Sequence, residues 1–390
     1  MGKFIKLSAI ISAILLIAFV IVFFAVLPRY IANSLNTVIN KSPYTVSEKA
    51  KQLHSKLFVA DLHADSLLWK RNLLEKDSIG QVDIPRMFEG NVALQAFTVV
   101  TKSPRGMNIE NNTGETDNIF WLALSEMQPF ENLSSLTGRA VFQAKKLHQF
   151  AEKSNGKFVV IESKKDLANF LEKRKTEKVV GGFLGIEGSH ALDGKVENVD
   201  VLFDAGFRMM SPTHFFDNDI GGSAHGVEKY GLTEKGKEII KRMQAKNMIV
   251  DVAHASTQTI DDVLAIATKP VVVSHTGVKG TCDNTRNLSD EQLKAIAKTG
   301  GVIGIGFWDT ATCGEDAKSI AKAIRYTASV IGVEHVGLGS DFDGSVKIPF
   351  DVSGEALITE ALINEGFSND EIAKIMGGNV LKLLGENLPG

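Results

Sequence analysis

Six short apolar runs in this chain each lead into residues that can bind a metal ion or transfer a proton. These residues are His63 with Asp65, Glu187, His214, His254, His275 and Asp341. Short uninterrupted apolar runs are typical of parallel strands that are buried on both faces. Barrels of parallel strands carry their catalytic residues at the carboxyl ends of the strands. The pattern therefore predicts a barrel with reactive side chains gathered at its mouth.

Two further apolar runs, at 92–100 and 301–307, bring the number of predicted strands to eight. Helical patterns alternate with the runs, at 233–245, 289–298, 317–331 and 370–384. Ser289 is a predicted N-cap, and Gln292 stands at the capping-box position. The interval 101–153 predicts a long loop and a helix beside the site. The alternation predicts an α/β protein with a (β/α)8, TIM-like barrel.

The composition fits a globular protein and offers no basic surface. Of 390 residues, 44% are hydrophobic and 23% charged, which allows a large buried core. The net charge is -3 and the pI is about 6.3, and no run rich in Lys and Arg is interleaved with aromatic residues. Nucleic acid is therefore not an expected partner.

The N-terminal segment is an uncharged apolar stretch at 7–27. At about 1.5 Å per residue, it is long enough to cross a hydrocarbon core of about 30 Å. A cleaved signal peptide is the alternative, but Ala25-Val26-Leu27-Pro28 is a poor cleavage site. We therefore expect a cytoplasmic tail and transmembrane anchor at 1–30, a polar tether at 31–47 and a catalytic barrel at 48–390.

Charges beside the apolar stretch predict its orientation. Lys3 and Lys6 precede it, together with the terminal amine, and only Arg29 follows closely. Positive charge tends to stay on the cytoplasmic side. We expect a single-pass membrane protein with a cytoplasmic N-terminus and an exported domain, in a periplasm or an extracellular space.

The chain has two cysteines, Cys282 and Cys313. In an exported protein this pair predicts one disulfide, and two buried free thiols are the alternative. Zinc binding by the cysteines is disfavoured because neither a Cys-x-x-Cys spacing nor a third cysteine accompanies them.

The reactive residues form a pattern of metal ligands. His63 and Asp65 are two residues apart, so their side chains point to the same face of one strand. His254 and His275 end neighbouring strands, and Glu187 ends a strand between the two pairs. Five ligands are too many for one tetrahedral zinc ion, whereas two ions bridged by a carboxylate account for all five. Glu187 is the expected bridge.

The motifs around these residues resemble the membrane dipeptidase (renal dipeptidase) family, peptidase family M19. The resemblance spans about 57–384. It is carried by His63-Ala64-Asp65, Gly185-Ile186-Glu187-Gly188, Thr213-His214, Asp251-Val252-Ala253-His254-Ala255-Ser256, Ser274-His275, Thr285-Arg286-Asn287-Leu288-Ser289-Asp290, Gly339-Ser340-Asp341-Phe342-Asp343-Gly344 and Ile375-Met376-Gly377-Gly378-Asn379. The family's usual first motif has Gly and Asn where this chain has Leu62 and Ala64, and both ligands remain.

The resemblance implies roles for individual residues. It implies two zinc ions per chain, held by His63, Asp65, Glu187, His254 and His275. His214 is then expected to contact the substrate or the tetrahedral intermediate, and Asp341 to move protons at the bridging water. Arg286 is expected to bind the terminal carboxylate of the substrate. The family often has a disulfide where Cys282 stands, which favours its pairing with Cys313.

The residues and the resemblance together predict zinc-dependent hydrolysis of dipeptides by a hydroxide that bridges two metal ions. Another amidohydrolase-type amide or ester hydrolase is an alternative, as is an inactive membrane-anchored binding protein. Dimers are common among the relatives, so a homodimer is an expectation as well. His190 and His225 lack a position at a strand end and are interpreted as core or loop histidines.

Overall fold

Eight parallel strands close into a barrel in the computed structural model, which describes residues 2–390. The neighbours in the ring run β2-β1-β9-β8-β7-β6-β5-β4, and pairing of β2 with β4 closes it. The strands are β1 (Val59–Ala64), β2 (Val92–Val100), β4 (Val180–Glu187), β5 (Phe207–Met210), β6 (Ile249–Asp251), β7 (Val271–Thr276), β8 (Ile303–Ile305) and β9 (Val336–Leu338). Every residue of these strands is buried, as the uninterrupted apolar runs predicted. The predicted (β/α)8 barrel is confirmed.

A ninth strand, β3 (Phe158–Val160), lies outside the ring and pairs with the beginning of β4. It has three residues, two of them only partly buried, so its apolar pattern is too short to predict. The main hydrophobic core lies between the strands and the helices that surround them.

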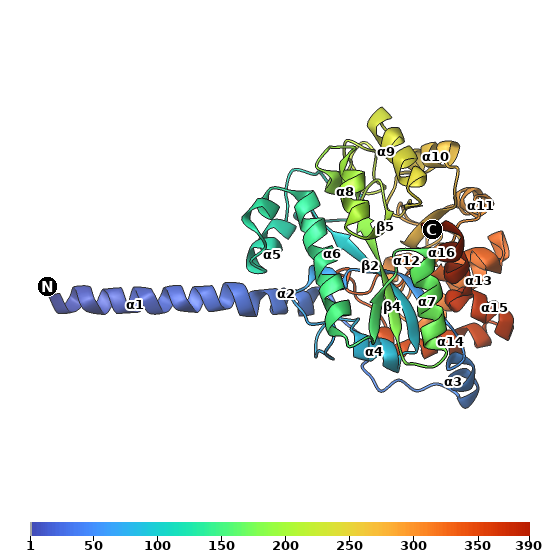
Figure 1. Ribbon diagram of the computed structural model, residues 1–390, viewed down its shortest axis with the longest axis horizontal. Coiled ribbons are helices and arrows are strands. Elements are labelled where there is room, and N and C mark those ends of the chain that lie inside the picture. The colour runs from blue at the N-terminus through green and yellow to red at the C-terminus, as the bar shows by residue number, and fades with distance from the viewer. Residues whose placement is uncertain (1) are drawn as a thin grey trace.

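Helices surround the barrel in the alternating order that the sequence predicted (Figure 1). They are α3 (Glu48–His54), α4 (Ile84–Glu89), α5 (Ile119–Ser125), α6 (Leu136–Lys153), α7 (Lys164–Arg174), α8 (Asn198–Asp204), α9 (Glu234–Ala245), α10 (Thr257–Ile266), α11 (Asp290–Lys298), α12 (Asp309–Thr312), α13 (Ala317–Ile331), α14 (Ala356–Asn364), α15 (Asn369–Ala373) and α16 (Asn379–Asn387). Ser289 caps α11, and Gln292 completes the capping box. The structure therefore has this N-terminus where the sequence predicted it.

The single helix predicted at 370–384 is divided in the structure. A π-helical turn, Lys374–Gly378, separates α15 from α16, and Gly377 departs from helical backbone angles. A Cβ atom at Gly377 would overlap with the carbonyl oxygen of Phe58. The helix is therefore interrupted where its backbone packs directly against the chain entering β1.

One long N-terminal helix extends away from the barrel (Figure 1). It comprises α1 (Gly2–Ile21), a π-helical turn (Val22–Val26) and α2 (Leu27–Leu35). By length and composition, Phe4–Leu35 is a candidate membrane span, and a signal sequence near the N-terminus would have the same properties.

The predicted tether at 31–47 begins inside α2, which is docked on the barrel. Ala32 is buried in a small apolar cluster with Ile119 of α5. Arg29 also forms an ion pair with Asp77 at 2.8 Å. These contacts hold α2, the last part of the candidate span, against the domain.

His54, at the end of α3, predicts a dependence of stability on pH. Its Nδ1 lies 2.8 Å from Thr359 Oγ1, and its Nε2 lies 2.8 Å from the carbonyl oxygen of Gly90. Burial lowers the pKa of His54 below 6.5, although the Gly90 carbonyl acts in the opposite direction. The unfolded chain therefore binds a proton more readily, and the stabilisation by His54 is present above about pH 6.5 and lost as the pH falls.

We expect the unfolding temperature of the full chain to decrease when the pH is lowered from about 7.5 to about 5.5. The decrease should be smaller in His54→Gln. Differential scanning fluorimetry of both proteins measures the two differences. Loss of metal at low pH affects both proteins alike, so the comparison isolates His54. An equal fall in both would contradict the prediction.

Candidate metal centre

The barrel brings the predicted site residues together at the carboxyl ends of its strands. His63 lies in β1, Glu187 ends β4 and His275 lies in β7. The others lie beyond strand ends, Asp65 after β1, His214 after β5, His254 after β6 and Asp341 after β9. All seven side chains are buried. The shared position follows from the fold, because parallel strands of a barrel end at the same rim.

Glu187 lies at the centre of this cluster. Its Oε1 is 3.0 Å from His254 Nε2, 3.3 Å from His275 Nε2 and 3.5 Å from His63 Nε2. Its Oε2 is 2.9 Å from His214 Nε2. Two groups of ligand atoms therefore share this carboxylate, and within each group the atoms lie within 4.8 Å of one another. The groups are His63, Asp65 and Glu187, and Glu187, His254 and His275.

The donor set fits a metal ion. Buried His63 Nε2 and Glu187 Oε1 have no hydrogen-bond partner. Burial lowers the pKa of His63, but the carboxylates of Glu187 and Asp65 outweigh it and raise the pKa to about 10. The cluster therefore favours a positive charge at His63 Nε2, which a divalent cation would supply. Imidazole and carboxylate donors suit zinc among the divalent metals.

Three buried polar residues behind the cluster orient its ligands. Ser274 Oγ lies 3.0 Å from Nδ1 of both His63 and His275, so the Nε2 atoms of both rings face Glu187. Asp251 accepts a hydrogen bond from Ser274 N at 2.9 Å, and Asp61 accepts one from His63 N at 3.0 Å. Such partners fix the tautomer and direction of metal-binding histidines. We did not predict these roles, and the only signal in the sequence is that each residue is next to or near a ligand.

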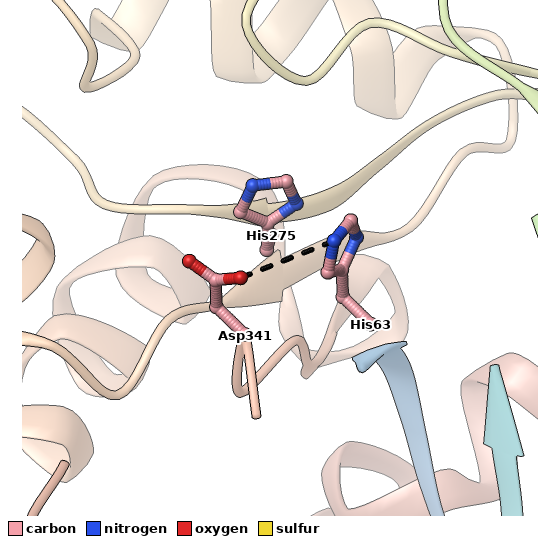
Figure 2. Close-up of side chains that lie close together, drawn as sticks. All are labelled: His63, His275 and Asp341. Carbon is pink, nitrogen blue, oxygen red and sulfur yellow. Dashed lines mark ion pairs between the residues drawn. The ribbon is translucent and has the colours of Figure 1, made fainter. Parts of the chain in front are cut away.

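Asp341 lies on a tight loop after β9. Its φ is 64°, and Asp343 follows with φ of 60°. Asp341 Oδ1 is 3.9 Å from His63 Nε2 (Figure 2). Asp343 pairs with Arg71 and accepts a hydrogen bond from Gln81 N at 2.7 Å, which holds the loop in this unusual conformation. A side-chain oxygen of Asp341 also lies within 4.8 Å of ligand atoms of His63 and His275, so its carboxylate is close enough to bind a metal ion as well as to move protons.

Arg286 lies beside the candidate metal ligands and is buried. One guanidinium nitrogen donates to the carbonyl oxygen of His275 at 2.6 Å, and another donates to Thr276 Oγ1 at 3.2 Å. Burial lowers the pKa of Arg286 to about 10, so the side chain remains a cation at neutral pH. Its Nε has no hydrogen-bond partner. The residue therefore retains a donor for an anionic group.

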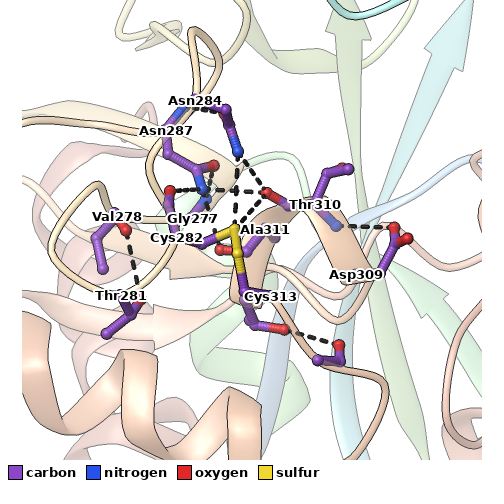
Figure 3. The surroundings of a disulfide bond; sticks show 12 residues. Gly277, Val278, Thr281, Cys282, Asn284, Asn287, Asp309, Thr310, Ala311 and Cys313 are labelled. Carbon is purple, nitrogen blue, oxygen red and sulfur yellow. Dashed lines mark hydrogen bonds between the residues drawn. A yellow bond between two sulfur atoms is a disulfide. The ribbon is translucent and has the colours of Figure 1, made fainter.

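The predicted disulfide between Cys282 and Cys313 is present (Figure 3). It joins the loop that carries Arg286 to the segment after α12. Asn287 adds to this link, because its side-chain amide donates to the carbonyl oxygens of Cys282 and Thr310 at 2.7 and 3.1 Å. The Arg286 loop is thus held from two sides.

Loss of the disulfide is expected to destabilise the folded chain. The two cysteines are 31 residues apart, and closing a loop of that size stabilises a protein by about 2–4 kcal/mol. The double variant Cys282→Ser/Cys313→Ser should lose that amount of free energy of unfolding in chemical denaturation. An unchanged denaturation midpoint would show that the surrounding hydrogen bonds suffice.

A cavity of about 780 Å³ extends from the cluster of candidate metal ligands to the N-terminal helix. At one end it is lined by Asp65, Glu187 and Arg286, and at the other by Phe23, Leu27 and Trp121. This volume lies in the range of about 300–1,000 Å³ that is usual for small-molecule sites. The N-terminal helix is therefore part of the wall of the candidate site, which the sequence pattern did not predict.

His225 also lines this cavity, although its sequence position gave no reason to include it. Its ring stacks on Phe215 with centroids 4.4 Å apart and lies 5.0 Å from the ring of His254. Its Nδ1 is 2.8 Å from the carbonyl oxygen of Ile109, and its buried Nε2 has no hydrogen-bond partner. A long loop folds His225 into the site, so no strand-end signal marks it.

Comparisons with known proteins agree with this architecture. The model of the membrane dipeptidase family, peptidase family M19, matches residues 47–388. Dipeptidase aclJ of Aspergillus oryzae (strain ATCC 42149 / RIB 40) is 28% identical over 358 residues, covering 86% of this chain and 79% of that protein.

Solved structures show the same fold. The probable dipeptidase PvdM from Pseudomonas aeruginosa is 20% identical with a TM-score of 0.72, and the match covers 87% of this chain and 98% of that one. A metallopeptidase from Rhodobacter sphaeroides, bound to a phosphinate mimic of the dipeptide L-Ala-D-Ala, is 22% identical with a TM-score of 0.67, covering 85% and 99%. With a family match over most of its length, this chain belongs to the membrane dipeptidase family, peptidase family M19, and is a metal-dependent dipeptidase.

Proposed function

We propose that this protein hydrolyses dipeptides with two zinc ions at the mouth of its barrel. The observation that carries the proposal is that Glu187 belongs to two groups of convergent metal-ligand atoms. His63 and Asp65 would hold one ion, His254 and His275 the other, and Glu187 would contact both. When bound, the two ions would lower the pKa of a shared water towards neutrality and polarise the scissile carbonyl group.

The remaining polar residues of the site suit the proton transfers of amide hydrolysis. Asp341 would accept a proton from the attacking water and deliver it to the leaving amine, because its buried carboxyl lies beside the ligand cluster. His214 would donate a hydrogen bond to the developing oxyanion, since its Nε2 lies beside Glu187. With Asp341 as proton carrier and His214 as hydrogen-bond donor, the proposed hydrolysis needs no other titratable side chain.

Arg286 would bind the free carboxylate of a dipeptide. The variant Arg286→Met is expected to raise KM for a dipeptide roughly 10- to 100-fold, because a hydrogen bond to a charged group contributes about 1.5–3 kcal/mol. Steady-state kinetics on a dipeptide and on its C-terminal amide make the comparison. The amide lacks the carboxylate, so its KM should be the same for both proteins. A similar rise for both substrates would contradict the carboxylate role.

We also propose that the apolar stretch 7–27, in α1 and the turn after it, anchors the protein in a membrane with its N-terminus in the cytoplasm. Lys3 and Lys6 precede the span, which supports this orientation. The disulfide supports an exported domain, because such bonds persist in oxidising compartments.

The experiment that tests the proposed function measures metal content and dipeptide hydrolysis in the full chain, purified in detergent. Substrates are a small panel of L,L and L,D dipeptides. About two zinc ions per chain with turnover are expected. Zinc without turnover of any dipeptide would favour another amide or ester hydrolase, and a chain that binds no metal would favour an inactive binding protein.

A further inference from the structure

The apolar stretch 7–27 fixes where a membrane would meet the catalytic domain. At about 1.5 Å per residue it spans about 30 Å, which matches the thickness of a hydrocarbon core. A bilayer that spans this stretch leaves Lys3 and Lys6 outside and has its other surface near Leu27, so the π-helical turn Val22–Val26 lies just inside that surface. This placement rests on the proposed membrane anchor.

Helix α5 lies at the level of that turn. It packs against Val22–Val26 and lies beside the end of the long helix (Figure 1). Lys70 links the two segments, because its Nζ donates to the carbonyl oxygens of Phe24 and Ser125 at 3.2 and 3.3 Å. The apolar cluster that contains Ala32 of α2 and Ile119 of α5 adds to this link. The position of α5 relative to the membrane surface is therefore set by the anchor.

Three large apolar side chains project into solvent from α5 and the turn after it. Trp121, Met127 and Phe130 are 52%, 70% and 86% exposed. Among the described residues after Tyr30, Trp121 and Phe130 are the two exposed aromatic side chains. We call these three residues the α5 surface.

We propose that the α5 surface is a second membrane-contacting site, which inserts into the interface of the leaflet from which α1 emerges. Aromatic side chains are enriched at the level of lipid headgroups, and apolar faces of interfacial segments bury about 5–10 Å into that region. Glu126, beside the α5 surface, is neutralised by Lys146 at 3.0 Å. The catalytic domain thus rests on the bilayer through α5 as well as through its anchor.

This arrangement places the active-site cavity at the membrane surface. Trp121 lines the outer end of the cavity together with Phe23 and Leu27, which belong to the emerging helix. Substrates would therefore enter along the membrane surface. The domain would be held in a fixed orientation on the bilayer, with the metal cluster at the inner end of the same cavity.

Tryptophan fluorescence tests the α5 surface in the full chain. The protein has three tryptophans, of which Trp69 and Trp308 are 2% and 9% exposed, and the N-terminal helix contains none. The full chain is reconstituted in phosphatidylcholine vesicles with ordinary or brominated acyl chains. We expect brominated lipid to quench the part of the emission that Trp121→Phe removes.

Two reporters in the Trp121→Phe background sharpen the test. Phe130→Trp should restore quenching by brominated lipid. The matched control Val201→Trp, at an exposed apolar position on α8, should not. If the protein floats with the vesicles but the emission of neither Trp121 nor Phe130→Trp is quenched, the proposal that the α5 surface contacts the membrane is contradicted. Protein that does not float with the vesicles would contradict both the membrane anchor and membrane contact by the α5 surface. Dipeptide hydrolysis by the same samples is measured separately and tests the proposed function.

Discussion

Replacing Asp341 with asparagine is expected to lower kcat for dipeptide hydrolysis by about 10²–10⁴-fold, the usual contribution of a positioned acid or base. Burial raises the pKa of Asp341 well above 3.8; His63 opposes this rise, and Asp65 adds to it. Bound cations would counteract part of this rise. The carboxyl is therefore suited to hold a proton between attack and departure of the amine. Asparagine keeps the shape of the side chain but cannot transfer a proton.

The same samples show whether Asp341 acts only as a proton carrier or also as a metal ligand. Metal content measured beside kcat should stay unchanged in Asp341→Asn if the residue only moves protons. A loss of metal would assign Asp341 to a metal site, which its distance from His63 and His275 allows. The matched control is Asp219→Asn, an exposed carboxylate paired with Lys235, which should leave both quantities unchanged. An unaltered kcat in Asp341→Asn would contradict the role.

Glu187→Gln is expected to release both metal ions. A neutral amide is a poor bridge between two cations, whereas the carboxylate of Glu187 lies within 3.5 Å of the Nε2 atoms of His63, His254 and His275. Metal analysis of the purified full chain should find less than about one ion per chain, against about two in the wild type. Turnover should disappear with the metal.

A comparison with a single-site variant tests the bridge. His254→Asn should lose about one ion and keep the other, because His254 belongs to only one of the two ligand groups. Glu197→Gln, at an exposed position, is the matched control for the chemical change. Equal metal loss in Glu187→Gln and His254→Asn would contradict a bridging carboxylate.

Much of the fold could be predicted because its elements follow from local patterns. Buried parallel strands need uninterrupted apolar residues, and the runs at 92–100 and 336–340 show them. The capping box at Ser289 is likewise a local signal. The predictions were incomplete where packing overrides the pattern. The helix predicted at 370–384 is interrupted because Gly377 meets the backbone of Phe58, a residue far away in the sequence.

The candidate ligands could be identified from the sequence because each follows a strand, and the ends of parallel strands must meet at one rim. Their roles as metal ligands and proton carriers stay predictions until the variants are measured. Residues that reach the cavity from loops gave no such signal. His225 is carried there by a loop that contacts Ile109, and periodicity says nothing about the path of a loop.

The sequence by itself determined the apolar runs, their reactive ends and the long apolar N-terminal segment. These depend on residue type and spacing along the chain. Only the tertiary structure decided that Ser274 lies between two ligand histidines, and that α2 and α5 form the outer wall of the cavity. The physical reason is that such contacts join segments far apart in the chain, so their geometry depends on how the whole barrel packs.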